Sequence, residues 1–451
     1  MADRTRLPVP AADAPFAFPG IHKSVLDNGL AVWTVPHRSV PVATMVLLVR
    51  AGSSADPAGR DGLASLTGDM LDEGAGSRTA LEVHEALADI GAQFDTEVGP
   101  DATFLTLTTL TRFRDDGLRL LSDLAVRPRF DPPEFARVRD LRANRLRQLR
   151  DVPSAIADRA FATAIYGRHP YGHLAVGTID ALERMTLADV SGLHATRYHP
   201  ANAVLVIVGE GEHDGAVGAA RDAFGSWRGD ERPPPLAIGP PGPPASRLVV
   251  VNRERAPQSE LRIGHLGVSR RVADYHALVV ANLVFGGQFV SRLNMNLRER
   301  RGFTYGARSW FEFRLGPGPF QMSASVQTEV TGAAIAEMLA EARQLRTTHP
   351  ITSAELDTAR ATLTRGYPRN FETADQLARS VAQLALYELP DDYFARFVPT
   401  IAALDASTVQ AAAERHIDPD RLVTVVVGDS GRVTAALQTL ELGEPVLVTP
   451  G

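Results

Sequence analysis

The segment Tyr198-His-Pro-Ala-Asn-Ala-Val-Leu-Val-Ile-Val-Gly209 shares its residue pattern with a later segment, Ile417-Asp-Pro-Asp-Arg-Leu-Val-Thr-Val-Val-Val-Gly428. Pro419 minus Pro200 and Gly428 minus Gly209 both give an offset of 219 residues. Each copy follows a helical pattern and predicts a proline-marked turn that leads into a buried strand rich in Val, Ile and Leu. Two copies in register indicate a duplication. The alternative is that two helix–turn–strand units are alike by chance.

A proline-rich segment lies between the copies, at 229–246: Gly-Asp-Glu-Arg-Pro-Pro-Pro-Leu-Ala-Ile-Gly-Pro-Pro-Gly-Pro-Pro-Ala-Ser. Proline removes backbone donors and stiffens the chain, so we expect an extended linker. The sequence therefore predicts an N-terminal domain at 1–228, a linker at 229–246 and a C-terminal domain at 247–451. A length of 451 residues independently favours two or more domains.

Apolar periodicity predicts helices and strands that do not alternate strictly, which favours an α+β architecture over a doubly wound sheet. Strands at 30–35 and 43–49 are expected to form a hairpin, and 103–110 alternates as a half-buried strand. The expected helices cover 62–72, 80–90, 114–125, 133–149 and 153–166, and then 273–285, 290–300, 333–346, 353–365 and 373–386.

The composition is that of an ordinary globular chain, with 44% hydrophobic residues, a net charge of −6 and no cysteine. Such a charge offers no basic field, so no nucleic-acid partner is expected. The absence of cysteine excludes disulfides and thiolate metal sites. No apolar run approaches the roughly 18 residues of a membrane span. Residues 1–10 show no signal-like apolar core, so the cytoplasm is the expected location. A signal peptide removed before this start would instead indicate the periplasm.

A candidate functional motif lies in the second half of the chain: Phe285-Gly-Gly-Gln-Phe-Val-Ser-Arg-Leu-Asn-Met-Asn-Leu-Arg-Glu-Arg-Arg-Gly-Phe-Thr-Tyr-Gly-Ala-Arg-Ser309. We expect a helix to end near Arg301, with Gly302 as a left-handed cap. Arg298 then leaves the last turn and Tyr305 begins an extended segment, so both side chains would point into one cavity. The alternative is that Arg298 pairs with a nearby carboxylate and Tyr305 is a strand residue with its hydroxyl at the surface.

This stretch has a Gly-Gly turn, a Ser-Arg-Leu helix start, a Leu-Arg-Glu and a spaced Tyr, and it resembles the Arg…Tyr region of the insulinase/pitrilysin-type zinc peptidases, the inverted zincins. The resemblance implies catalytic roles for Arg298 and Tyr305: the tyrosine hydroxyl donates to the developing oxyanion, and the arginine orients substrate carbonyls. It further implies a tight turn at Gly286 and Gly287 that substrate can approach.

The same resemblance implies the overall architecture. We expect two duplicated domains, each an antiparallel sheet with flanking helices, in the LuxS/mitochondrial-processing-peptidase-like metallohydrolase fold. Together they would form half of a clamshell. The resemblance covers most of the chain, including the predicted strands, the degenerate helix described next and the Arg/Tyr stretch.

The family carries its zinc motif, H-x-x-E-H, on a helix that matches Gly62-Leu-Ala-Ser-Leu-Thr-Gly-Asp-Met-Leu-Asp-Glu-Gly74. Two histidines on one helical face bind the metal, and the glutamate activates the bound water. Ser65 stands at the position of the first His, Gly68 at that of the Glu and Asp69 at that of the second His. The helix therefore keeps the flanking pattern of the motif and lacks its chemistry.

The third zinc ligand of the family is a glutamate on a later helix, and it has no counterpart in the matching segment. Arg142, Arg145 and Arg147 occupy the later turns of that segment, 134–150, which has no carboxylate after Asp140. So few oxygen donors do not make the N,N,O set of a zinc site, so we expect no metal in this chain. The helix either attracts acidic groups or is simply amphipathic. Its expected inward face is Phe135, Val138, Leu141, Leu146 and Leu149.

These observations lead to one hypothesis. The chain is the non-zinc subunit of a heterodimeric zinc metallopeptidase, whose homologous partner carries H-x-x-E-H and the zinc. Peptides or unfolded protein segments are its substrates, and alone it hydrolyses nothing. Two alternatives stay open: an inert structural or substrate-binding homologue, like the core proteins of respiratory complexes, and a processing subunit that acts on one leader peptide.

Overall fold

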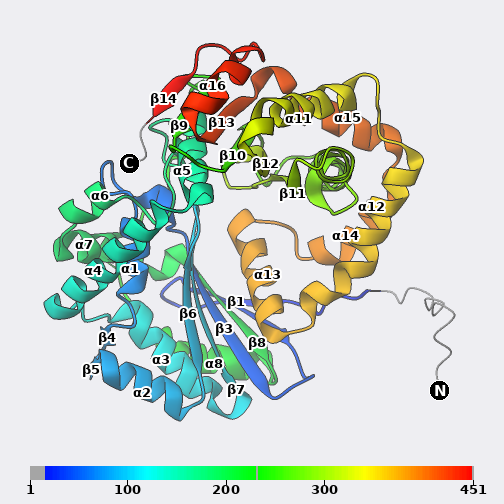
Figure 1. Ribbon diagram of the computed structural model, residues 1–451. Helices are drawn as coiled ribbons and strands as arrows, with labels where there is room; N and C mark the ends of the chain where they lie inside the picture. The colour runs from blue at the N-terminus through cyan, green and yellow to red at the C-terminus, as the bar shows by residue number, and fades with distance from the viewer. Residues whose placement is uncertain (1–15, 230–231, 449–451) are drawn as a thin grey trace, which may run out of the picture.

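The computed structural model describes residues 16–229 and 232–448, which form two halves that each contain a sheet flanked by helices (Figure 1). This arrangement confirms the predicted α+β class with two sheet-containing domains. Within these ranges, no helix has both the length and the apolar content needed to cross a membrane. Residues 1–10, in which the sequence shows no signal-like core, lie outside the described part of the chain.

The first sheet has the strand order β1-β2-β8-β3-β7-β6. Its strands are β1 (His22–Val25), β2 (Ala31–Pro36), β3 (Val42–Val49), β6 (Gln93–Val98), β7 (Thr103–Leu110) and β8 (Ala203–Gly209). The predicted hairpin of 30–35 with 43–49 is wrong, because β8 inserts between β2 and β3. The Val-Leu-Val-Ile-Val run of β8 is buried throughout, which suits a central strand covered on both faces.

The second sheet repeats this arrangement in the order β14-β9-β13-β10-β12-β11. Its strands are β9 (Leu248–Asn252), β10 (Gln258–Leu266), β11 (Thr304–Phe311), β12 (Pro319–Gln327), β13 (Val423–Gly428) and β14 (Val446–Val448). β13 inserts between β9 and β10 as β8 does between β2 and β3, so the two matched segments of the sequence occupy equivalent places and the duplication is borne out. The expectation of antiparallel sheets needs one correction: β2 and β8 are parallel, as are β9 with β13 and with β14.

The helices lie close to where apolar periodicity placed them. In the first half they are α1 (Leu63–Asp69), α2 (Ala80–Asp89), α3 (Arg114–Val126), α4 (Pro132–Leu149), α5 (Pro153–Tyr166), α6 (Ile179–Arg184), α7 (Leu187–Arg197) and α8 (His213–Phe224). In the second they are α9 (Tyr275–Asn282), α10 (Arg292–Asn294), α11 (Thr331–Arg346), α12 (Ser353–Gly366), α13 (Ala374–Tyr387), α14 (Tyr393–Ala403), α15 (Ala406–His416) and α16 (Ser430–Gln438). The expected helices 273–285 and 290–300 differ, because each continues into a π-helical segment, Leu283–Gly287 and Met295–Arg300.

Each half lends one helix to the sheet of the other half. α13 packs on β3 and β8 of the first sheet, where Ala378 and Val381 are buried with Val46. α5 packs on β9, β10 and β13 of the second sheet, where Phe161 is buried with Val425. Burial of this apolar surface joins the two halves into one body, because removing either helix would expose a sheet face to water.

The predicted linker has no helix or strand over the described residues 232–246. It contacts the rest of the chain, since the aliphatic side chain of Ile238 packs against the buried cluster that contains Tyr171. Nε2 of His169 also lies 2.8 Å from the carbonyl oxygen of Gly239. The linker is therefore extended but anchored, and the domain boundaries drawn from it stay a prediction.

Candidate functional site

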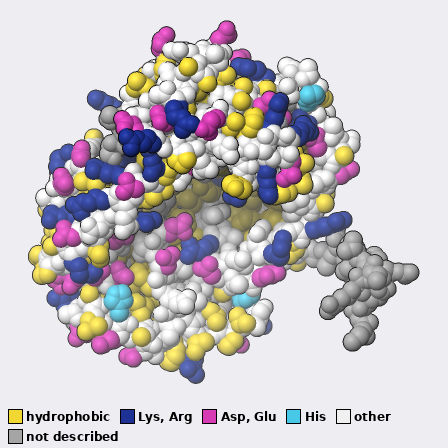
Figure 2. Space-filling view, in the orientation of Figure 1, with side chains coloured by type: hydrophobic (Ala, Val, Ile, Leu, Met, Phe, Trp, Pro, Cys, Tyr) yellow, Lys and Arg dark blue, Asp and Glu magenta, His cyan; other side chains and the backbone are white. Residues whose placement is uncertain are grey.

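The surface is hollowed between the two halves, with acidic and basic side chains around the hollow (Figure 2). In Figure 1 the two sheets stand on either side of this region, and β6 and β11 are the edge strands at corresponding ends of the sheets. The candidate residues come from two places. One is α1, which packs against β6, and the other is the helical segment that precedes β11.

α1 is the helix that matches the zinc-motif helix of the resembling family, and a buried carboxylate fixes its N-terminus. Asp56 accepts hydrogen bonds from the backbone N–H of Gly62 at 2.6 Å and of Ala64 at 2.7 Å. Burial raises the pKa of Asp56 to about 6, although these two donors and His173 act in the opposite direction. The position of α1 is therefore set by backbone capping, independently of any metal.

The positions of the degenerate motif lie on the side of α1 that meets β6 and α4. Ser65 is buried. A Cβ atom added to Gly68 would come within 2.9 Å of Cγ2 of Thr96 on β6, so a larger side chain fits there only if its neighbours move. Asp69 forms a salt bridge with Arg142 of α4. The sequence did not reveal this pairing, because it joins residues on two helices.

The Asp69–Arg142 pair shows that these side chains do not fit a zinc ion. A guanidinium brings a permanent positive charge to the place where the metal would sit, and it engages the one carboxylate of the motif. Ser65 adds a single neutral oxygen, and the motif positions contain no histidine. Among the residues that the structure describes, no cluster of three or more His, Cys, Asp or Glu side chains is arranged to hold a metal ion.

α4 is amphipathic as predicted, with one correction. Phe135, Val138 and Leu146 are buried, but Leu141, which we expected to pack inward, is 57% exposed. At 3.6 residues per turn, Leu141 lies roughly 100° from the centre of the buried face, whereas Arg142 lies near that centre. The helix therefore points Arg142 rather than Leu141 toward α1.

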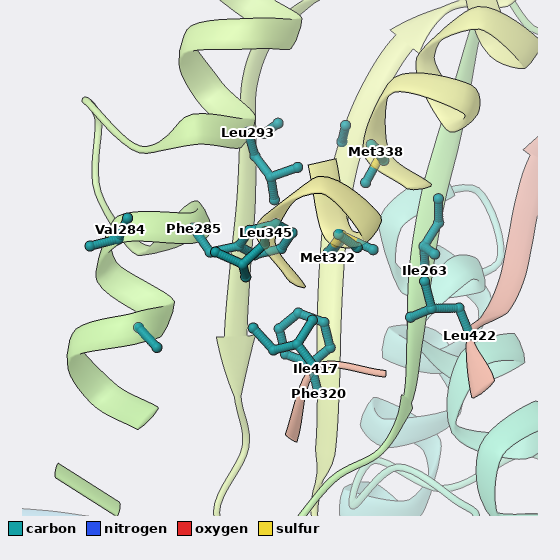
Figure 3. Packing of buried hydrophobic residues seen from close by; sticks show 14 of the residues in the cluster. Ile263, Val284, Phe285, Leu293, Phe320, Met322, Met338, Leu345, Ile417 and Leu422 are labelled. Carbon is teal, nitrogen blue, oxygen red and sulfur yellow. The ribbon is translucent and has the colours of Figure 1, made fainter. Parts of the chain in front are cut away.

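The second candidate region begins with two π-helical segments, Leu283–Gly287 and Met295–Arg300. Such segments are rare, and they occur disproportionately at functional sites. Apolar side chains anchor them: Phe285 of the first segment and Leu293 of α10, which leads into the second, are fully buried and lie in the same core as Met322 of β12 (Figure 3). The segment that carries Arg298 thus rests on a packed core.

Two asparagines tie this segment to β11. Asn282 donates to the carbonyl oxygen of Ser309 at 3.1 Å and accepts from its hydroxyl at 2.8 Å. Asn294 donates to the carbonyl oxygen of Phe289 at 2.7 Å and accepts from the backbone N–H of Ala307 at 3.2 Å. We did not single out either asparagine from the sequence. The available signal was a polar residue inside a predominantly apolar helical pattern.

Arg298 and Tyr305 therefore stand on neighbouring elements with a fixed relation. The guanidinium of Arg298 lies 4.6 Å from the ring centre of Phe289, and its Nε lies 3.3 Å from Oε1 of Glu299. Tyr305 is near the start of β11 and is 91% exposed. Gly302, between them, has a φ of 65°, which is the left-handed cap that the sequence predicted. The two features of the alternative interpretation, a nearby carboxylate and an exposed tyrosine, are also present.

Packing explains the Gly-Gly turn. A Cβ atom on Gly286 would lie 2.4 Å from the hydroxyl oxygen of Ser309, and one on Gly287 would lie 2.8 Å from Nδ2 of Asn282. Gly286 is buried and Gly287 is exposed. Gly286 lets the π-helical turn approach β11, and Gly287 lets it pack against Asn282. Their part in binding substrate stays a prediction.

The arginine of the Ser-Arg-Leu sequence has a structural partner. Arg292 makes two parallel hydrogen bonds of 2.7 Å to the carboxylate of Glu355 on α12. Burial alone would raise the pKa of Glu355, but Arg292 and the backbone N–H of Thr352 outweigh it and bring the pKa down to about 2. This bidentate pair fixes the start of α10, so Arg292 has a structural partner within the chain.

Two family models match the chain. Residues 32–178 match the insulinase (peptidase family M16) model, and residues 184–363 match the peptidase M16 inactive domain. This chain belongs to the M16 peptidase family. The second match spans the stretch with the linker, the π-helical segments, Arg298 and Tyr305, so the M16 inactive-domain model covers the second candidate region.

Relatives and solved structures agree with this assignment. The M16 chain is 26% identical over 423 residues to an uncharacterized zinc protease of Mycobacterium tuberculosis, covering 93% of this chain and 95% of that protein. The crystal structure of a peptidase M16 inactive domain from Pseudomonas fluorescens matches with a TM-score of 0.85 and 25% identity, over 91% of this chain and 98% of that chain. A protease from Helicobacter pylori shares the fold, with a TM-score of 0.84 and 20% identity over 91% and 100% of the two chains.

Proposed function

We propose that this M16 chain is the non-zinc subunit of a heterodimeric zinc metallopeptidase. One observation carries the proposal. Asp69 is bound to Arg142 where metal ligands would stand, whereas the half-buried Arg298 and the exposed Tyr305 are both present. A homologous subunit with H-x-x-E-H would bind the zinc, which activates water and polarises the scissile carbonyl when present. The match to the M16 inactive-domain model supports the division of labour.

In this proposal, Tyr305 stabilises the developing oxyanion. Its side chain is 91% exposed on β11, so its hydroxyl is free to donate to an incoming carbonyl oxygen. The asparagine contacts to β11 hold the strand in place before substrate arrives. A donor that is already oriented stabilises transition-state charge without reorganisation, which is worth about 10²–10³ in rate.

Arg298 would bind and orient carbonyl groups of an extended peptide. One face of its guanidinium is covered by Phe289, which limits the positions that the group can adopt. Its neighbour Glu299 is adjacent in sequence and half-exposed, so a substrate carbonyl can replace that contact at small cost. Peptides or unfolded protein segments are the substrates of this proposal, because Arg298 and Tyr305 can both donate hydrogen bonds to the carbonyl oxygens of an extended chain.

Reconstitution tests the proposal. The chain, its H-x-x-E-H homologue from the same cell and an equimolar mixture are each assayed with an internally quenched peptide. We expect cleavage by the mixture only, and loss of that cleavage when a zinc-ligand histidine of the homologue is replaced by alanine. Full activity of the homologue without this chain would contradict the proposal.

A structural role is the second candidate, and one observation favours it. Arg298 already lies 3.3 Å from a carboxylate, and Tyr305 lines none of the cavities found beside Arg159, His213 and Asp123. A scaffold subunit would form the same complex and tolerate the loss of both side chains. The double variant Arg298→Ala/Tyr305→Phe separates the two functions, because it should abolish catalysis only in the first.

A further inference from the structure

A cavity of about 440 Å³ lies between the two halves, and neither candidate region contributes to it. α5 of the first half forms one wall, and β9 and β14 of the second half form another; Figure 1 shows α5 beside these strands. The remaining lining residues come from the end of α4, from the loop that follows residue 173, and from Ala245 and Ser246 before β9. The cavity is therefore built jointly by both halves.

The walls are apolar because of the strand register. β14 runs parallel to β9, with Val446 opposite Val249 and Val448 opposite Val251, so all four side chains share the face that α5 covers. Val446 is nevertheless 47% exposed, since α5 reaches β9 but stops short of the edge strand. Small residues on α5, including Ala160, leave the space unfilled. Protein interiors normally close such apolar volumes, so this one is fit for a ligand.

Two arginines give the apolar cavity a positive end. Arg150 at the end of α4 and Arg159 on α5 both line it. The guanidinium of Arg159 donates to the carbonyl oxygen of Gly177 at 3.1 Å, and no carboxylate of the described residues is within salt-bridge distance of either arginine. Burial, and then the charge of Arg150, lower the pKa of Arg159, while the more distant Asp61 opposes them. An anion placed between the two arginines would relieve this repulsion.

We propose that the cavity binds an alkyl carboxylate of the fatty-acid type. The hydrocarbon chain lies along α5, β9 and β14, and the carboxylate binds Arg150 and Arg159. The volume is within the range of about 300–1,000 Å³ that small-molecule sites occupy. Guanidinium groups bind carboxylates through paired, charge-assisted hydrogen bonds. Because the walls come from both halves, the ligand joins them, and this inference is independent of the proposed peptidase role.

Calorimetric titration of the full chain with three ligands of equal chain length tests the charge requirement. The ligands are dodecanoate, dodecanol and dodecylamine, the two ionic ligands below their micelle concentrations and dodecanol below its solubility limit. We expect one dodecanoate per chain, dodecanol weaker by about tenfold or more, and no binding of dodecylamine. Equal binding of all three would show non-specific apolar adsorption and overturn the proposal. Tighter binding of an apolar tripeptide with a free carboxylate would overturn the fatty-acid assignment.

Variants test the location. Arg159→Gln and Arg150→Gln should each weaken dodecanoate binding by about tenfold. Val446→Asp places a carboxylate in the cavity at a half-exposed position, so the chain should fold and dodecanoate should not bind. Arg145→Gln is the matched control, because Arg145 is an exposed arginine of α4 that does not line the cavity. Unchanged binding by Val446→Asp, with thermal unfolding like that of wild type, would place the ligand elsewhere.

Discussion

The two candidate regions, α1 in the first half and the segment before β11 in the second, differ in how their polar side chains are bonded. On α1, the polar group at a motif position is satisfied internally, since Asp69 is bound by Arg142. Before β11, the internal contacts are made by Asn282, Asn294 and Arg292. Tyr305 is exposed to solvent, and Arg298 is half-buried beside Phe289 and Glu299. The first region has become self-contained, whereas the second still presents hydrogen-bond donors.

The comparison teaches how a site can be judged in the absence of ligand. A region that has lost its role is expected to satisfy its polar groups within the chain, because unpaired buried polar groups cost free energy. In a region that keeps a role, the neighbouring residues hold the backbone in position, and the functional side chains stay accessible to a ligand. The two regions of this M16 chain differ in this respect, and the experiments below test the difference.

The largest effect is expected from Tyr305→Phe in the reconstituted enzyme. Loss of one preorganised oxyanion donor should lower kcat by about 10²–10³, with no change in Tm because the side chain is 91% exposed. Steady-state assays with a quenched peptide measure the first quantity and calorimetry the second. Arg308→Ala, an exposed residue on the same strand, is the control and should keep full activity. Equal kcat for Tyr305→Phe and wild type would show that the Tyr305 hydroxyl has no catalytic role and would remove the difference between the two regions.

Gly286→Ala should reduce stability by about 1–3 kcal/mol, because the new methyl group would overlap the backbone nitrogen and hydroxyl of Ser309. Urea unfolding measures the change. The matched control is Gly306→Ala, whose Cβ would have its nearest neighbour at 3.8 Å and should stay within about 0.5 kcal/mol of wild type. A loss of activity without a loss of stability would instead give Gly286 a direct part in binding substrate.

The Arg292–Glu355 pair should make the free energy of unfolding depend on pH in the acidic range. The pKa of Glu355 is lowered to about 2 from an ordinary value of 4.5, so its carboxylate stabilises the fold above pH 4.5. This contribution, roughly 1–3 kcal/mol, should be lost as the pH falls from about 4.5 to about 2. Glu355→Gln should flatten that part of the stability–pH curve, as followed by urea unfolding. Asp357→Asn, on the same helix and exposed, should leave the curve unchanged.

The smallest effect is expected on α1. Asp69→Asn should change stability by about 1 kcal/mol or less, because the Asp69–Arg142 pair is partly open to solvent. It should also leave the metal content of the isolated chain unchanged after equilibration with zinc, measured by atomic emission. Stoichiometric zinc in the wild-type chain, lost on this substitution, would contradict the self-contained character of the region.

Local patterns in the sequence carried much of the fold. The 3.6-residue period placed α5 at its observed bounds and α2, α3 and α11 within about two residues, because these helices bury one continuous apolar stripe. The hairpin expected between 30–35 and 43–49 was wrong, because β8, which lies far away in the sequence, inserts between these two strands. Local sequence patterns also failed to predict the π-helical segments, because these segments depend on the contacts of Gly286 and Asn282 with β11.

The amino-acid sequence alone indicated the duplication, and its family resemblance indicated that Ser65, Gly68 and Asp69 stand at zinc-motif positions and that the Arg298–Tyr305 stretch is present. These properties are contained in residue identity and spacing. The tertiary structure added the Asp69–Arg142 pair, the exchange of α5 and α13 between the halves, and the cavity beside Arg159. Each of these depends on contacts between residues far apart in the chain, and no local periodicity encodes which distant surface a segment will meet.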